Sequence, residues 1–176
     1  MKNKAVVIGS AALAAMLLSP VSAALDGLSV DLGHSSESTT TLRLGAQWDF
    51  GQTLWRSQGG DLALDGYWDL AATHWGSLDT ASIDASPVFR LNFAAGDQGA
   101  QAYFEAGIGI AWFSRSRLAP GTNLGSSLQF ADRIGLGLRL ANGNDVGLRF
   151  FHYSNAGFNR RNSGVETLAL HYRFNL

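Results

Sequence analysis

The chain has 176 residues, no cysteine and a formal net charge of −1. Without cysteine, disulfides, thiol catalysis and cysteine-bound metals are excluded, and the near-zero net charge argues against nucleic acid as a partner. The chain is rich in glycine (21), phenylalanine (10) and tryptophan (5). This mixture, with charges spread singly along the chain, is typical of many short alternating strands and does not fit a soluble helical domain.

The first 23 residues have the layout of a secretory signal peptide. A positively charged start is followed by a largely apolar run from Ala5 to Leu18, and Val21-Ser22-Ala23 supplies small residues for cleavage. An uncleaved membrane anchor is the alternative, but the apolar run is shorter than the ~20 residues that span a bilayer. Residues 1–23 are therefore predicted to be removed, which leaves 24–176 as one domain.

Eight segments that alternate between apolar and polar residues fill this domain, and glycine, proline or asparagine separates most of them. An even number of alternating segments is the rule for bacterial outer-membrane barrels. In chain order the predicted strands are 26–36, 40–50, 61–72, 82–94, 101–114, 128–140, 144–154 and 166–176.

The polar faces of these segments carry charges of both signs. Eight strands make a barrel whose interior is just filled by side chains, and mixed charges in a narrow lumen can pair with one another. The sequence thus predicts an all-β, eight-stranded antiparallel transmembrane barrel with a polar, filled interior. A soluble barrel with its apolar face inward is the alternative. The predicted lumen charges include Arg43, Asp65, Asp69, Arg90, Glu105, Arg139, Asp145, Arg149 and Arg173.

Three polar residues break the alternation at one end of the barrel. His152 and Ser154 continue the apolar phase of the seventh strand, and Glu166 continues that of the eighth. Polar groups on a lipid face are costly, so residues that violate the pattern are candidates for function. Because residues 155–165 join the two strands, we expect the strands to be neighbours and the three side chains to share one outward face.

These residue types can form a hydrolytic triad. A serine hydroxyl needs a base to take its proton, and a histidine base needs a carboxylate to fix its tautomer. The alternative is three polar residues at the membrane interface, where a polar side chain costs little free energy. His34 and Ser36 have the same spacing at the end of the first strand. The pattern alone does not separate the two pairs.

The segment from His152 to Glu166 resembles the motif of the outer-membrane lipid A 3-O-deacylases, the PagL family: His-x-Ser-Asn-Ala, a short loop with asparagine and glycine, then glutamate. The resemblance implies a metal-free and cofactor-free ester hydrolase that removes the 3-hydroxyacyl chain at position 3 of lipid A. It assigns Ser154 as nucleophile, His152 as general base and Glu166 as the orienting acid. His34 and Ser36 have no such support and are expected to be interface residues.

The same motif suggests roles for the loop between these strands. Asn155, with the backbone N–H groups near Ala156 and Gly157, matches the region expected to stabilise the oxyanion. The other loop residues that the resemblance brings forward are Asn162, which matches the motif, and Arg160 and Arg161, which either contact lipid A phosphates or are ordinary solvated charges.

Two other functions fit the barrel as well: a non-catalytic structural barrel, and a phospholipase-like barrel. The expected partners are lipid A or lipopolysaccharide and the bacterial outer membrane. The preferred acyl length, a homodimer and the regulation of activity are left open by the sequence.

Overall fold

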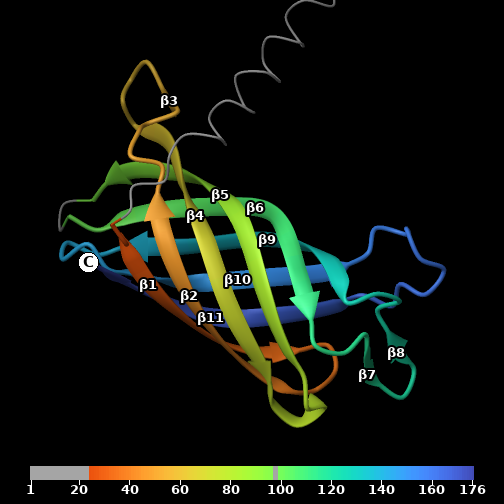
Figure 1. Ribbon diagram of the computed structural model, residues 1–176. Helices are drawn as coiled ribbons and strands as arrows, with labels where there is room; N and C mark the ends of the chain where they lie inside the picture. The colour runs from red at the N-terminus through yellow and green to blue at the C-terminus, as the bar shows by residue number, and fades with distance from the viewer. Residues whose placement is uncertain (1–23, 97–98) are drawn as a thin grey trace, which may run out of the picture.

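The computed structural model describes residues 24–96 and 99–176, so the signal peptide predicted for residues 1–23 lies outside the described residues. In this part of the chain no helix is long and apolar enough to cross a bilayer. Eight long strands form a closed antiparallel barrel (Figure 1). They are β1 (Gly27–Ser35), β2 (Thr40–Asp49), β4 (Leu62–Trp75), β5 (Ala81–Ala95), β6 (Gln101–Phe113), β9 (Leu128–Arg139), β10 (Asp145–Ser154) and β11 (Val165–Asn175).

Strands that follow one another in this series are paired, and β1 pairs with β11 to close the barrel. Closure leaves no free sheet edge, whose backbone N–H and C=O groups would find no hydrogen-bond partner in lipid. The predicted eight strands are confirmed; the largest difference is at β4, which runs on to Trp75 instead of ending at residue 72.

Four short elements lie in the connections. The two-residue strand β3 (Trp55–Arg56) and the turn η1 (Gly76–Leu78) lie beside β4 at its two ends. The hairpin of β7 (Arg117–Ala119) and β8 (Thr122–Asn123) lies at the end of the barrel away from the C-terminus (Figure 1), which we call the distal end. Strand β10 ends and β11 begins at this same distal end.

The alternation predicted from the sequence is the alternation of the structure. Large apolar side chains such as Leu44, Ile108 and Leu170 are exposed on the outer wall, while polar and charged side chains are buried in the lumen. An apolar outside and a polar inside are what a barrel in lipid requires.

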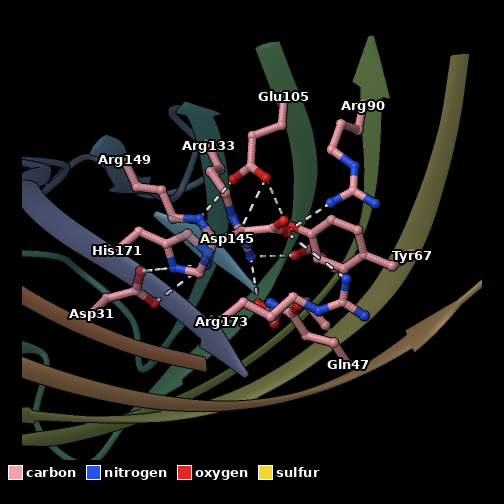
Figure 2. A network of polar contacts seen from close by, with 12 residues as sticks. Asp31, Gln47, Tyr67, Arg90, Glu105, Arg133, Asp145, Arg149, His171 and Arg173 are labelled. Carbon is pink, nitrogen blue, oxygen red and sulfur yellow. Dashed lines mark hydrogen bonds and ion pairs between the residues drawn. The ribbon is translucent and has the colours of Figure 1, made fainter. Parts of the chain in front are cut away.

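Paired charges fill the middle of the lumen (Figure 2). The Arg43 guanidinium bonds the carboxylates of Asp31, Asp69 and Asp84. Further along, Arg149 donates to Glu105 at 2.7 Å. Other pairs complete the network: Arg149 with the Tyr67 hydroxyl, Arg133 with Asp69, Arg90 with Asp145, and His171 with Asp31. The middle of the interior is a polar plug, as the sequence predicts.

The lumen is apolar at its distal end. The rings of Trp75, Phe113 and Tyr153 lie within 5.3–5.7 Å of one another, and Leu124 and Val165 are buried in the same cluster. Tyr153 stands between His152 and Ser154 in the sequence. Because successive strand residues point to opposite faces, this anchored ring holds the strand that presents the two candidate residues to the outside.

The lumen network generates a stability prediction. Asp69 is the one carboxylate that bonds Arg133 in the described part of the chain, and it also bonds Arg43. Asp69→Ala therefore leaves buried positive charge uncompensated, and we expect it to cost about 3–5 kcal/mol of unfolding free energy. Urea unfolding of the refolded protein, followed by its heat-modifiable migration on a gel, measures this. The exposed Asp61 provides the control; equal midpoints for Asp69→Ala and Asp61→Ala would contradict the prediction.

Candidate active site

Register places His152 and Glu166 directly opposite each other on β10 and β11. The two residues are half-buried on the outer wall, and His152 Nδ1 lies 2.9 Å from Glu166 Oε1. A carboxylate at Nδ1 holds that nitrogen in its protonated form. The other ring nitrogen, Nε2, is then the one with a lone pair, which is the arrangement of a general base.

Ser154 lies two residues beyond His152 on the same face of β10, opposite Phe130 of β9. Its side chain is half-buried. Within the described part of the chain no hydrogen bond joins Ser154 to His152. Hydrogen bonds between catalytic groups are often long before substrate binds. The structure thus brings all three predicted residues to one outward patch and pairs two of them directly.

Gly164 comes immediately before β11 and touches this patch. Its φ is +68°, a conformation that glycine adopts at little cost. A Cβ added here would lie 3.2 Å from His152 Cε1 and 3.8 Å from Glu166 Oε1. The absence of a side chain at Gly164 therefore allows the loop to pass close to the imidazole. The sequence motif contains this glycine, but periodicity gives no sign of its role.

Asn155 organises the loop between β10 and β11. Its side-chain nitrogen donates to the carbonyls of Leu124 and Arg161, both at 2.7 Å, and its backbone N–H donates to Asn162 Oδ1 at 2.9 Å. The buried Asn155 amide is thus occupied in joining the loop to the segment after β8. Asn162, which the motif left without a role, holds the backbone just after Ser154.

A tight turn of residues 155–158 follows the serine. Ala156 and Gly157 both have positive φ, +51° and +82°, and Phe158 N–H donates to the Asn155 carbonyl at 3.0 Å. Gly157 N–H donates to Asn155 Oδ1 at 3.0 Å. Of the donors expected from the sequence, the backbone N–H of Ala156 is the one with no intramolecular partner in the described part of the chain. An alanine at positive φ is strained, and such strain clusters at functional sites.

Sequence reasoning missed Asp132. This residue of β9 lies directly opposite His152, on the side away from Glu166. It falls in the lipid-facing phase of its strand, so the broken alternation that revealed His152 would have revealed it as well. A row of facing residues therefore crosses four strands on the outer wall: Glu166, His152, Asp132 and Ile108.

An apolar hollow of about 630 Å³ starts at His152 and Asp132 and runs along the outer wall. Two small residues, Pro87 and Ala106, form part of its lining. The remaining outward side chains of its lining are Phe89, Ile108, Ile134 and Phe150. The polar patch thus sits at one end of a lipid-like groove.

The remaining predicted residues lie around the distal end. Arg160 and Arg161 are exposed and line a polar cleft between their loop and the β7–β8 hairpin. His34 is exposed on the outer wall opposite Leu168. Ser36 Oγ accepts a hydrogen bond of 3.2 Å from the backbone N–H of Glu166. Ser36 is therefore an interface residue that also contacts the strand carrying the acid.

Metal ligands do not cluster in the described residues: no group of three or more His, Asp or Glu side chains is placed there to hold an ion. The chemistry that the patch offers is that of a serine, an imidazole and a carboxylate.

Comparison with known proteins agrees with this geometry. A family model described as "Lipid A 3-O-deacylase (PagL)" matches residues 40–175. Lipid A deacylase PagL of Pseudomonas aeruginosa is 44% identical over 150 residues, covering 83% of this chain and 84% of the relative. The Bordetella bronchiseptica protein of the same name is 38% identical over 130 residues, with 69% and 70% covered.

A solved structure supports the fold as well. The crystal structure of the outer membrane enzyme PagL superposes with a TM-score of 0.78 at 43% identity, and the match covers 85% of this chain and 99% of that one. Family model, relatives and barrel therefore lead to one conclusion. The chain belongs to the PagL family of lipid A 3-O-deacylases.

Proposed function

We propose that this chain is a lipid A 3-O-deacylase of the bacterial outer membrane, in which Ser154 is the nucleophile, His152 the general base and Glu166 the acid that orients it. The observation that carries the proposal is the 2.9 Å contact between His152 Nδ1 and Glu166 Oε1 on the lipid-facing wall, with Ser154 on the same face. Family membership supports the substrate class.

The reaction proceeds in two half-reactions. His152 Nε2 takes the Ser154 proton as Oγ attacks the ester carbonyl, and Glu166 stabilises the imidazolium that forms. The tetrahedral intermediate collapses, the sugar 3-hydroxyl leaves with the proton from His152, and the acyl group stays on Ser154. Water activated by His152 then attacks this acyl-enzyme, which releases the 3-hydroxy fatty acid and restores the serine.

The oxyanion needs a preorganised donor beside the serine. Because the amide of Asn155 and the N–H of Gly157 are occupied within the loop, we assign this role to the Ala156 N–H. Asn155 then contributes by holding the turn, and Asn162 by fixing the backbone of Asn155.

The apolar groove suits the acyl chain that is removed. It begins beside His152 and is lined by aliphatic and aromatic side chains, so a chain lying in it keeps its contacts with apolar groups while its ester lies at the patch. Lipid A reaches such a site by diffusing within its own leaflet. Every residue of the proposed triad comes from one chain, so a homodimer is not needed to complete it.

Substitution of the triad tests the mechanism. Ser154→Ala removes the nucleophile and His152→Ala removes the base, so we expect each to lower deacylation by about 10⁴-fold or more. Glu166→Ala should lose less, because the histidine remains and loses mainly its orientation. The double variant Ser154→Ala/His152→Ala should be no worse than the worse single variant, since the residues act as a unit.

The readout is the loss of one hydroxyacyl group from purified lipopolysaccharide, which mass spectrometry detects. Phospholipid vesicles form the second arm. Hydrolysis of phospholipid but not lipopolysaccharide would indicate a phospholipase-like barrel, and hydrolysis of neither would indicate a structural one. Heat-modifiable migration confirms that each variant is folded.

The other serine of this region should behave differently. Ser36→Ala removes one hydrogen bond to the Glu166 backbone, a loss of about 1 kcal/mol, so deacylation should fall by no more than about tenfold. His34→Ala should leave the rate near that of the wild type. If Ser36→Ala is inactive while Ser154→Ala remains active, the nucleophile has been assigned to the wrong strand.

Gly164 generates a further prediction. Gly164→Ala places a methyl group against the His152 ring and strains a residue with positive φ. We expect deacylation to fall by about tenfold or more while the barrel stays folded, because the imidazole must shift from its position beside Glu166 to make room for the methyl group. Gly157→Ala is the matched control, since φ there is +82° and nothing lies within 4 Å of the added Cβ. Equal losses in both variants would assign the effect to backbone strain alone.

A further inference from the structure

A cleft of about 480 Å³ opens at the distal end, between the β7–β8 hairpin and the loop that follows Ser154. Three arginines line it: Arg117 from β7, and Arg160 and Arg161 from the loop. The rest of its lining is uncharged, with Asn123, Asn162 and Ser163 among the polar residues. In the described part of the chain none of the three guanidinium groups has a carboxylate partner. Figure 1 shows the hairpin and the loop at the same end of the barrel.

Hydrogen bonds hold the two walls of the cleft together. Asn123 and Ser163 bond each other twice, Asn123 N–H to Ser163 Oγ and Ser163 N–H to the Asn123 carbonyl, both at 3.2 Å. Asn159 Nδ2 donates to the Gly125 carbonyl at 2.9 Å. A Cβ at Gly125 would collide with the carbonyl oxygen of Arg161, so the walls touch backbone to backbone.

The same contacts tie the cleft to the proposed catalytic strand. Asn155, the residue after Ser154, bonds Asn162 and the Arg161 carbonyl, both part of the cleft lining. The cleft therefore has a fixed position relative to the nucleophile. Three like charges gathered around one cleft repel one another, and the tied loop limits how far they can separate. An anion in the cleft would remove that repulsion.

We propose that this cleft binds a phosphate group on the sugar headgroup of the lipid substrate, with Arg117 acting together with Arg160 and Arg161. Guanidinium groups bind phosphate with paired, charge-assisted hydrogen bonds. The inference rests on the proposed function, because lipid A is a phosphorylated glycolipid whose headgroup lies at the membrane surface when its acyl chain lies in the groove. It adds a second contact between enzyme and substrate, at the headgroup phosphate, which lies nearer to the aqueous phase than the ester does.

Arg115 offers a matched control. It lies two residues before Arg117 in the same distal segment, but it is exposed and paired with Asp79 at 2.6 Å. Arg115→Ala removes a charge of the same kind from the same end of the barrel without touching the cleft.

Binding is measured first, with full-length protein that carries Ser154→Ala so that no turnover occurs. Bisphosphorylated lipid A and fully dephosphorylated lipid A are titrated into the protein in neutral detergent micelles. We expect the phosphorylated lipid to bind at least about tenfold more tightly, and Arg117→Ala, or Arg160→Ala with Arg161→Ala, to abolish most of this difference. Arg115→Ala should keep it. A preference for phosphorylated lipid that survives in both cleft variants, or no preference at the outset, would overturn the proposal.

Inorganic phosphate, titrated into the same protein, is the third arm. We expect it to bind far more weakly than the phosphorylated lipid; equal affinity that disappears with Arg117→Ala would assign the cleft to free phosphate ions and overturn the headgroup assignment. Turnover by protein with an intact Ser154 is then compared on the two lipids. If neither lipid is hydrolysed, the proposed function is refuted. The binding measurements still decide whether the cleft recognises phosphate.

Discussion

The pairing of charges inside the barrel is the interaction on which the rest of the structure depends. Arg43, with its three aspartates, and Arg149, with Glu105 and Tyr67, occupy the space that a wider barrel would leave to water. Charges buried in this way are tolerated only when they are paired. Because these side chains fill the middle of the lumen, the candidate site lies on the outer wall instead.

The outer wall can carry chemistry because a closed sheet is a rigid support. Backbone pairing fixes Glu166 opposite His152 and Asp132 opposite His152 from the other side, so the order of the groups follows from register alone. The Tyr153 ring packs against those of Trp75 and Phe113 and anchors the end of β10 to the apolar part of the lumen. Sites on strands are placed more precisely than sites on loops, and only the turn after Ser154 departs from the sheet.

Much of this could be predicted from the sequence, because strand alternation has a strict period of two. The eight strands, and the placing of His152 and Ser154 on the apolar face of theirs, follow from that period. The period does not say which face is outward; the charges of both signs on the polar faces favoured a polar lumen and an apolar outer wall. Asp132 breaks the same rule and was available to the same reasoning.

The remainder depends on contacts between segments far apart in the sequence. Asn155 bonds the carbonyl of Leu124, 31 residues away, and no local pattern signals that an amide will be used in this way. For the same reason Arg117 could not be grouped with Arg160 and Arg161 before the hairpin and the loop were seen side by side. The aromatic cluster at the distal end was also missed, since Trp75 belongs to a part of β4 beyond the predicted strand.

If Ser154 is the nucleophile as proposed, its place near two unlike surfaces lets so small a barrel act on so large a lipid. An apolar groove that suits an acyl chain begins beside His152, and a cleft lined by three arginines lies between the β7–β8 hairpin and the loop that follows Ser154. In the proposed mode of binding, an amphipathic substrate held by both surfaces has its ester near His152 and Ser154. Binding energy from parts of a substrate that do not react can be used to orient the part that does. In this proposal, a substrate with the chain but no headgroup charge binds through the groove alone, so the spacing of groove, cleft and Ser154 sets the selectivity.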